Sequence, residues 1–454
     1  MNKEKINMQL EQDDKKYLWH PFTQMKDYVK EQPLIIEKGK GSFLFDINGN
    51  KYLDGISSLW VTTHGHGKKE INDAISEQLE RVSHTTLLGL SHPKAIELAK
   101  RLAAITPDGL EKVFYSESGS TSVEIALKIA FQYCLQSGKE FVKKKKFISL
   151  VNAYHGDTIG SVSVGGIDLF HQTYHPLLFE TIKAEPVYCY RCSLGKTRGS
   201  CSLECLTQLE ETIKKHHKET AALIIEPVIQ GAAGMLVYPE GYMKGVRKLC
   251  TKYDILMIAD EVAVGFGRTG RMFACEHEDV TPDIITLGKG LTGGYLPLAA
   301  TVTTEKIYNA FLGEYDEFKT FYHGHSYTGN PLGCAAAIAN LNIFEQEKTL
   351  ENLVEKIEVL KNRLHDFYEL SHVGDVRQFG FMAGIELVAK KDTKTAYEPG
   401  NKIGNKVIMD ARKKGVILRP LGDVIVLMPP LSITIDELNM LLDVTFDSIK
   451  TVTS

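Results

Sequence analysis

The chain has 454 residues, more than one ordinary hydrophobic core organises, so we expect two domains or one elaborated α/β unit. Its 53 basic and 57 acidic residues give a net charge of −4, and the two signs are mixed along the chain. This balance does not favour nucleic-acid binding, and the longest apolar runs are far shorter than the roughly 20 residues that span a bilayer. Residues 1–14 are polar and lack the apolar core of a secretory signal, so we expect a cytoplasmic protein.

A β-hairpin is predicted near the N-terminus. Residues 43–54 form two short strand-like runs around Asn48-Gly49, a dipeptide typical of two-residue hairpin turns. We expect the segment 1–75 to complete a smaller domain that is formed mainly by the other end of the chain.

The middle of the chain has the pattern of βαβ units. Short apolar runs alternate with segments of helical periodicity, as in a parallel sheet covered by helices on both faces. The predicted strands are residues 113–116, 146–150, 222–226, 256–260, 284–287 and 298–302. A helix over 121–134 is expected to begin with a capping box formed by Thr121 and Glu124. We assign residues 76–340 to a large α/β domain.

The character of the sequence changes after Asn330-Pro331. Long helices are predicted over 332–346 and 350–369, followed by further helices and strands of ordinary length. These are strands over 382–388 and 424–427 and helices over 402–414 and 435–449. We therefore expect a compact α+β domain over 341–454.

The chain has eight cysteines and no secretory context, which favours reduced thiols. Four of them are spaced as C-x2-C and C-x3-C, namely Cys189, Cys192, Cys201 and Cys205. This spacing is compatible with a zinc site, and equally with a cysteine-rich surface loop. Both interpretations stay open, and we assign no metal to the predicted active site.

An acid and a lysine follow two of the predicted strands. Asp260 ends the apolar run 255–260, and Lys289 comes two residues after the run 284–287. In a parallel sheet both lie at the carboxyl edge, where ligands bind. A lysine there can hold an aldehyde as an imine, and an acid can protonate a pyridine nitrogen, as the chemistry of pyridoxal 5'-phosphate (PLP) requires. The alternative for Lys289 is a solvated side chain in the glycine-rich segment 288–294.

Three other strand ends offer supporting groups. Residues 117–121, Glu-Ser-Gly-Ser-Thr, open a helix with more hydroxyl groups than a simple cap needs, which favours phosphate binding. Tyr154 follows the strand 146–150 and could stack on a planar cofactor, although tyrosines at strand ends are often only packed. Glu226 ends another strand at the same edge.

The stretch 258–294 carries a family resemblance. It reads IADEVAVGFGRTG and, after a spacer, PDIITLGKGLTGG, which resembles the diagnostic pattern of the class III (omega-type) aminotransferases of PLP fold type I. The resemblance extends over nearly the whole chain. It implies an α/β fold with a mostly parallel seven-stranded sheet, a smaller α+β domain, and a PLP-dependent aminotransferase.

The resemblance also implies roles for individual residues. Lys289 would hold the cofactor and move a proton between the substrate's amine-bearing carbon and the cofactor, and Asp260 would hold the pyridinium. The other cofactor contacts would be Gly119, Ser120, Tyr154, Glu226 and, from the neighbouring subunit, Ser326. The active site would therefore lie at the interface of a homodimer.

Within the family, the stretches 18–25, 54–60, 419–420 and 427–430 are similar to the branch that serves biotin synthesis. That branch aminates 8-amino-7-oxononanoate to 7,8-diaminononanoate. The implied substrate contacts are Phe22, Trp60, Tyr154, Lys289 and Arg419, with Arg268 at the same mouth. The apolar rings suit the substrate chain and Arg419 suits its carboxylate. The ordinary alternatives are that Trp60 belongs to the core and that Arg419 forms a surface ion pair.

The chain departs from the family pattern at three positions. Leu59 and Phe22 stand where many members have tryptophan and tyrosine, and His325 stands where proline is common. The departures leave the amino donor open, with S-adenosylmethionine expected and lysine as the alternative. Two rival functions are a broad omega-aminotransferase and a non-catalytic PLP-binding module, the latter disfavoured because both catalytic residues are present.

Overall fold

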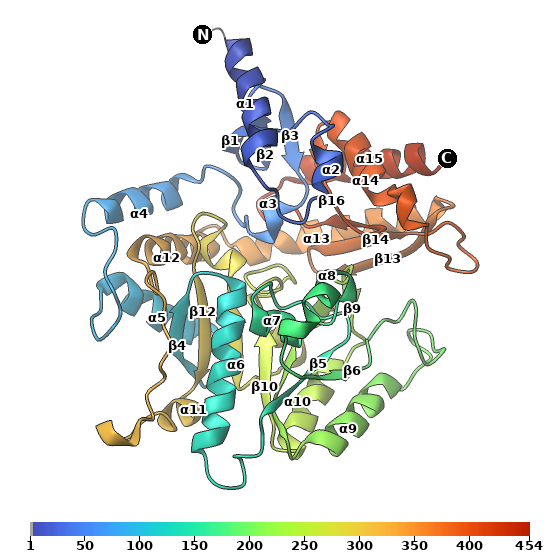
Figure 1. Cartoon of the computed structure of the whole chain (residues 1–454). Helices are drawn as coiled ribbons and strands as arrows, with labels where there is room; N and C mark the ends of the chain where they lie inside the picture. Colours follow the sequence, from blue (N-terminus) through green and yellow to red (C-terminus); the bar gives the residue numbers. More distant parts are fainter. Residues whose placement is uncertain (1–2) are drawn as a thin grey trace.

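The computed structural model describes residues 3–454 and contains a central seven-stranded sheet (Figure 1). In spatial order its strands are β4 (Leu110–Ser116), β12 (Ala299–Thr304), β11 (Ile284–Leu287), β10 (Leu256–Asp260), β7 (Thr220–Ile225), β5 (Lys146–Leu150) and β6 (Ile182–Ala184). Only β12 runs antiparallel to its neighbours, so the sheet is mostly parallel, as predicted. All six predicted strands are present, and β6 is an additional strand that the sequence pattern did not indicate.

Helices cover both faces of this sheet. Ile224, Ile258 and Ile284 pack in one apolar cluster with α6 (Gly119–Gln136). Their chain neighbours, such as Ile225 and Met257, belong to the other cluster, which includes the buried side of α10 (Tyr242–Lys252). Burial on both faces is the reason that these strands read as continuous apolar runs.

The predicted capping box of α6 is wrong. The helix begins at Gly119, Ser118 is its N-cap, and the box pairs Ser118 with Thr121. Glu124 instead accepts hydrogen bonds from the backbone N–H groups of Gly160 (2.7 Å) and Ser161 (3.2 Å). It therefore ties α6 to the segment that follows Tyr154.

A second sheet and its helices are formed by the C-terminal part of the chain. The strand order is β13 (Val373–Phe379), β14 (Met382–Leu387), β17 (Val424–Leu427) and β16 (Arg419–Leu421), all antiparallel. The accompanying helices are α13 (Thr349–Asp366), α14 (Ile403–Lys413) and α15 (Ile435–Thr453).

The N-terminal hairpin pairs with a strand of the C-terminal part. A third sheet has the order β1 (Ile36–Lys40), β2 (Phe43–Asp46), β3 (Lys51–Asp54) and β15 (Val416–Ile417). The parallel pairing of β3 with β15 brings the two ends of the chain to the same side of the molecule (Figure 1). The domain boundaries near residues 75 and 340 stay predictions.

The remaining elements connect these sheets. The α-helices are α1 (Lys3–Tyr17), α2 (Met25–Tyr28), α3 (Ser57–Trp60), α4 (Lys69–Leu79), α5 (Pro93–Ile105), α7 (Ile159–Val164), α8 (Asp168–His171), α9 (Glu204–His216), α11 (Glu305–Asn309) and α12 (Pro331–Gln346). The 3₁₀ helices are η1 (Gln172–Leu177), η2 (Ala274–Glu278), η3 (Lys289–Thr292), η4 (Tyr315–Glu317), η5 (Phe367–Glu369) and η6 (Pro399–Asn401). Strands β8 (Ile229–Gln230) and β9 (Leu236–Val237) form a small hairpin. No helix within residues 3–454 is long and apolar enough to cross a lipid bilayer.

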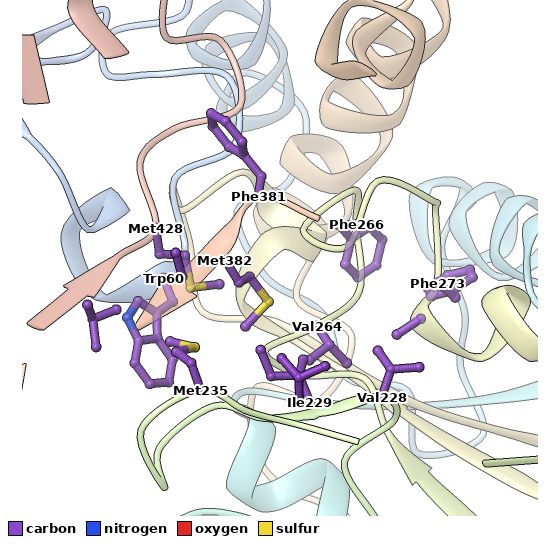
Figure 2. Close-up of a cluster of buried hydrophobic side chains, with 14 of the residues drawn as sticks. Trp60, Val228, Ile229, Met235, Val264, Phe266, Phe273, Phe381, Met382 and Met428 are labelled. Carbon is purple, nitrogen blue, oxygen red and sulfur yellow. The ribbon is translucent and has the colours of Figure 1, made fainter. Parts of the chain in front are cut away.

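An apolar cluster connects the central sheet with the C-terminal sheet. Figure 2 shows the Trp60 indole beside Met235, with Met382 and Met428 next to them. Met382 belongs to the C-terminal sheet, whereas Met235 immediately precedes β9. This part of the core therefore fixes the position of Trp60 relative to both sheets.

Candidate active site

A pocket of about 150 Å³ lies at the carboxyl ends of β5, β7, β10 and β11. It is lined by Trp60, Ser118, Gly119, Ser120, Tyr154, His155, Gly156, Glu226, Ala232, Asp260, Val262, Ala263 and Lys289. Seven of the predicted site residues thus meet in one place. Three larger cavities of about 330, 400 and 470 Å³ lie elsewhere, and none of them is lined by a residue predicted for the active site.

Lys289 is the half-buried lysine of this pocket. It begins η3 with a φ of +44°, a backbone conformation that non-glycine residues rarely adopt. Its Nζ lies 4.8 Å from the centroid of the Trp60 ring. Burial lowers the pKa of Lys289 to about 8, against the opposing influence of the Asp260 and Glu226 carboxylates. The amine is therefore available as a nucleophile near neutral pH.

Asp260 is held in a fixed orientation. It is 4% exposed, and its Oδ2 lies 2.7 Å from Nδ1 of His155. Its Oδ1 accepts hydrogen bonds from the backbone N–H of Val262 (3.1 Å) and from the hydroxyl of Thr286 (3.2 Å). Thr286 is the register partner of Asp260 on β11, so the pairing of the two strands places this donor.

Glu226 joins two segments of the pocket wall. Its Oε2 accepts from the backbone N–H of Gly231 (2.9 Å) and its Oε1 accepts from that of Tyr154 (3.3 Å). Burial raises the pKa of Glu226 to about 7, and the nearby His155 opposes this rise only in part. The protonated and ionised forms of the Glu226 carboxyl group are therefore both populated near neutral pH.

Tyr154 contributes an aromatic wall. Its hydroxyl donates to Oδ2 of Asp157 at 2.7 Å, and its ring centroid is 6.4 Å from that of Phe170. Burial raises the pKa of Tyr154, so the hydroxyl stays protonated. The ring is thus fixed at one end, as a stacking surface for a planar cofactor requires.

The N-terminus of α6 closes another corner of the pocket. A Cβ on Gly119 would lie 2.4 Å from Cγ1 of Val262, and a Cβ on Gly156 would overlap Oγ of Ser120. Gly156 also has a φ of +124°, which favours glycine. Ser120 Oγ accepts from the backbone N–H of Asp157 at 3.0 Å. The chain segments around Gly119 and Gly156 therefore pack closely, and the N-terminal backbone N–H groups of α6 lie at the pocket, where they can bind an anion.

Arg419 and Phe22 lie beside the pocket. The guanidinium carbon of Arg419 is 5.8 Å from the Phe22 ring, and burial lowers the pKa of Arg419. Across residues 3–454 this guanidinium makes no hydrogen bond or ion pair, so the surface ion pair considered as an alternative is not formed. Phe22 is 57% exposed. The guanidinium lies near enough to Tyr154 and Lys289 for its charge to act on both, and without an anionic partner it is free to bind an anionic ligand.

Comparisons with known proteins agree with this geometry. Residues 25–449 match the family described as aminotransferase class-III. This chain belongs to the class III aminotransferases. A Geobacter sulfurreducens protein named adenosylmethionine-8-amino-7-oxononanoate aminotransferase is 55% identical over 441 residues, which are 97% of each chain. The sequence-based assignment to the family and to its fold is confirmed.

Solved structures of related enzymes share the whole fold. The crystal structure of the Methanocaldococcus jannaschii adenosylmethionine-8-amino-7-oxononanoate aminotransferase is 50% identical, with a TM-score of 0.93 over 98% of this chain and 99% of that one. An (S)-enantioselective omega-transaminase from Thermomicrobium roseum is 35% identical, with a TM-score of 0.93 over 98% of each chain.

One residue of this aminotransferase site was not assigned from the sequence. His155 directly follows Tyr154, and its side chain is fully buried against Asp260. Its Nε2 is buried without a partner within the described residues. Its position in the sequence could have indicated this role, because His155 follows Tyr154 just after β5, a strand that ends at the same edge of the sheet as Asp260.

Besides Phe22 and Arg419, two further predicted residues, Arg268 and Ser326, do not line the pocket, whereas Trp60 does. Arg268 is buried and donates to the backbone carbonyls of Pro429 (2.6 Å) and Thr62 (2.7 Å), so it ties loops together instead of lying at the mouth. Trp60 is 5% exposed, and it is both a core residue and a pocket wall. Ser326 is exposed and does not line the pocket of its own chain.

The cysteine-rich segment is separate from the aminotransferase site. Its four thiols are free, half-buried and line one small cavity of about 30 Å³. Within the part of the chain that the structure describes, no three His, Cys, Asp or Glu side chains are placed to hold a metal ion. The zinc interpretation therefore receives no support from the geometry.

Proposed function

We propose that this aminotransferase uses PLP held by Lys289 to convert 8-amino-7-oxononanoate into 7,8-diaminononanoate. The observation that carries the proposal is the unpaired Arg419 beside a pocket that contains Lys289 and Asp260. Relatives that are named for this reaction and match nearly the whole chain support the choice of substrate. A cytoplasmic location belongs to the same proposal, and cell fractionation tests it.

The pocket residues fit the parts of PLP. Lys289 would hold the aldehyde, the Asp260 carboxylate would face the ring nitrogen, and the N-terminus of α6 with Ser120 would hold the phosphate. Tyr154 would cover the ring. When bound, PLP supplies a carbonyl carbon that accepts amines and a ring that withdraws electrons from the amine-bearing carbon.

The chain's own residues then bind, orient and move protons. Nζ of Lys289, with its pKa lowered toward neutrality, can take a proton from the amine-bearing carbon of the donor and return one during the second half of the cycle. Asp260 is kept in place by His155 and Thr286, so its charge stays directed into the pocket. The donor leaves as an oxo product before the keto acid enters, as in a ping-pong cycle.

The substrate chain fits the remaining surfaces. The guanidinium of Arg419 would bind the carboxylate in a bidentate contact, while Trp60 and Phe22 would cover the apolar carbon chain. This arrangement puts the charged end of the substrate at the mouth and its keto group toward Lys289.

The proposed amino donor is S-adenosylmethionine, because the names of the relatives include it. Lysine is the alternative donor. The purified yellow protein is mixed separately with each compound, and the absorbance of the cofactor is followed. We expect S-adenosylmethionine to convert the cofactor to its pyridoxamine form; conversion by lysine alone would replace the donor and keep the rest of the proposal.

The rival function is that of a broad omega-aminotransferase, which the 35% identical omega-transaminase structure brings into consideration. Assays of 8-amino-7-oxononanoate and pyruvate as acceptors, with the same donor, separate the two. We expect a clear preference in kcat/KM for 8-amino-7-oxononanoate. A preference for pyruvate would favour the rival.

We also propose that the protein is a homodimer in which Ser326 contacts the cofactor of the neighbouring subunit. Chains carrying Lys289→Ala and Ser326→Glu are co-expressed with different tags, and mixed dimers are purified through both tags. If Ser326 serves the partner's cofactor, each mixed dimer has one intact site and recovers about half of the wild-type rate. If Ser326 serves its own chain, neither site is intact and the mixed dimers stay as slow as the single variants.

A further inference from the structure

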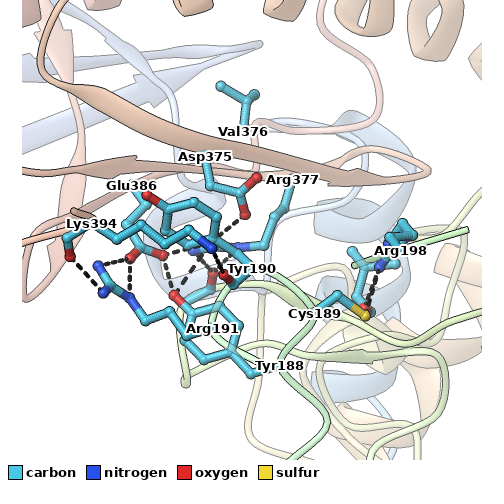
Figure 3. Close-up of polar contacts among 12 residues, drawn as sticks. Tyr188, Cys189, Tyr190, Arg191, Arg198, Asp375, Val376, Arg377, Glu386 and Lys394 are labelled. Carbon is cyan, nitrogen blue, oxygen red and sulfur yellow. Dashed lines mark hydrogen bonds and ion pairs between the residues drawn. The ribbon is translucent and has the colours of Figure 1, made fainter. Parts of the chain in front are cut away.

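The side chain of Arg377 crosses from the C-terminal sheet to the segment between β8 and β9. Arg377 lies on β13 with a side chain that is 7% exposed. Its Nη1 donates to Glu386 (2.6 Å) and to Asp375 (2.8 Å), while Nε and Nη2 both donate to the backbone carbonyl of Gly234, at 3.1 and 2.8 Å. Figure 3 shows this guanidinium among its carboxylate partners. One planar group thus holds two carboxylates and one carbonyl at once.

Glu386 gives Arg377 a fixed anchor. It lies on β14, and its Oε1 accepts a hydrogen bond from Nε of Arg191 (2.9 Å) and forms an ion pair with Nη2 of the same residue (2.7 Å), while the Tyr188 hydroxyl donates to Oε2 (Figure 3). Burial alone would raise the pKa of Glu386, but Arg377 and the hydrogen bonds lower it, so the carboxylate stays ionised. A buried carboxylate between two arginines cannot move without leaving a charge unpaired.

The carbonyl that Arg377 holds belongs to a turn at the wall of the pocket. Within residues 231–235 the N–H groups of Gly234 and Met235 donate to the Gly231 carbonyl at 3.1 and 3.0 Å. The N–H of Gly231 donates to Glu226, and Ala232 lines the pocket itself. The turn is therefore tied to Arg377 at one end and to an active-site carboxylate at the other.

The same turn packs against the Trp60 indole. A Cβ built on Gly231 would lie 3.4 Å from the Trp60 ring, and Met235 lies beside that ring in the apolar cluster (Figure 2). On its other side the turn packs directly on β14, where a Cβ on Gly384 would lie 3.0 Å from the Gly234 carbonyl. Displacing the turn would change the position of both Glu226 and Trp60.

We propose that Arg377 is a positioning residue of the active site, which holds the turn 231–235 against Trp60 and Glu226. The sheet that carries Arg377 also carries Arg419 on β16, so it fixes both the pocket wall and the group expected to bind the substrate carboxylate. Only a guanidinium can hold Glu386 and donate twice to the Gly234 carbonyl. The inference rests on the proposed function insofar as Trp60 and Glu226 serve that reaction.

The test uses the fluorescence of Trp60. The chain has two tryptophans, and Trp19 is 88% exposed, so Trp19→Phe leaves Trp60 as the only reporter. Arg377→Lys is added to this background in the full-length protein. Its matched control is Arg363→Met, which removes an arginine of α13 that donates to Asn439 (2.8 Å) and Asp443 (2.5 Å) and has no contact with the pocket. Acrylamide quenching of Trp60 and the thermal midpoint are measured for both.

We expect Arg377→Lys, and not the control, to raise the quenching constant of Trp60. We also expect it to lower kcat/KM with an amine that the parent protein accepts by roughly 10- to 100-fold, because small displacements of a site cost this much. If quenching is the same in the two variants, or rises without any loss of turnover, Arg377 is only a structural ion-pair residue and the inference is wrong.

A second variant keeps the test decisive if Arg377→Lys does not fold. Glu386→Gln retains Arg377 but neutralises its anchor, and smaller changes of the same sign are expected in both measurements. No change in either would overturn the inference. Because quenching requires neither substrate nor turnover, failure of the parent protein on 8-amino-7-oxononanoate would contradict the proposed function without altering this result.

Discussion

His155 Nδ1 lies 2.7 Å from Asp260 Oδ2, and both side chains are buried at the carboxyl edge of the central sheet. The imidazole therefore orients the carboxylate that is expected to face the cofactor ring. We predict that His155→Phe lowers kcat roughly 10- to 100-fold, as removal of a partner that orients a functional group commonly does. His155→Asn, whose amide can replace the Nδ1 donor, is expected to retain most of the activity. Equal activity of both variants and the parent would show that the contact is dispensable.

The attachment of PLP should depend on pH through Lys289. Its pKa is lowered to about 8, whereas an ordinary lysine titrates at about 10.4. Only the neutral amine attacks an aldehyde, so the rate at which cofactor-free protein takes up PLP should rise with pH up to about 8 and then level off. Absorbance stopped-flow measures this rate, with a free lysine derivative as the control. A rate that keeps rising toward pH 10, as for the free derivative, would contradict the lowered pKa.

Arg419 should be needed for substrates with a carboxylate. Because no anionic partner neutralises it within the described chain, its charge is available to a ligand. We expect Arg419→Met to raise KM for 8-amino-7-oxononanoate by roughly 10- to 100-fold, the cost of one charged hydrogen-bonded contact. An amine without a carboxylate, such as a simple alkylamine, is the control and should react equally with both proteins. An equal loss for both substrates would place Arg419 in a structural role.

The cysteines should fall into two classes. Cys189, Cys192, Cys201 and Cys205 are half-buried, whereas the other four are buried, and burial raises their pKa values. Burial also raises the pKa of Cys189 and that of Cys205, the latter to about 11, so within the first group Cys192 and Cys201 should react first. A thiol reagent added to native protein is expected to modify the four half-buried thiols before the others, which react only after unfolding. The protein purified without chelator should behave identically with and without added chelator. Four slow thiols that become fast with chelator, together with bound zinc, would revive the metal interpretation.

The sequence predicted best those elements whose pattern is set by burial on both faces. Strands β5, β10 and β11 begin and end where predicted, because most of their residues are apolar and almost all are buried. Strand β6 was missed because it has only three residues and Lys183 stands in its middle. The cap of α6 was misassigned because Glu124 bonds to the N-terminal turn of α7, more than thirty residues away, which no local pattern reveals.

The site was predictable where one residue type at a strand end carries the chemistry. Lys289, Asp260, Tyr154, Glu226 and the stretch 117–121 were singled out from their positions at strand ends, and the family resemblance added Trp60; the structure brings them to one pocket, while their roles stay predictions. The contacts of His155 and Arg268, and the lack of a partner for Arg419, depend on distances across the fold. The anchoring of the turn 231–235 by Arg377 spans 143 residues and was not foreseeable.

The most direct test of the account is to reduce the yellow protein with borohydride and map the modified peptide. Lys289 and Lys183 both have pKa values lowered to about 8, so reactivity alone does not distinguish them. Lys183 is engaged by the Ser149 hydroxyl (2.9 Å) and the Ser163 carbonyl (3.0 Å), and only Lys289 faces the pocket. We expect the cofactor on Lys289 and a Lys289→Ala protein that binds PLP without turnover. Cofactor attached to Lys183 or any other residue, or no attached cofactor, would contradict the proposed site.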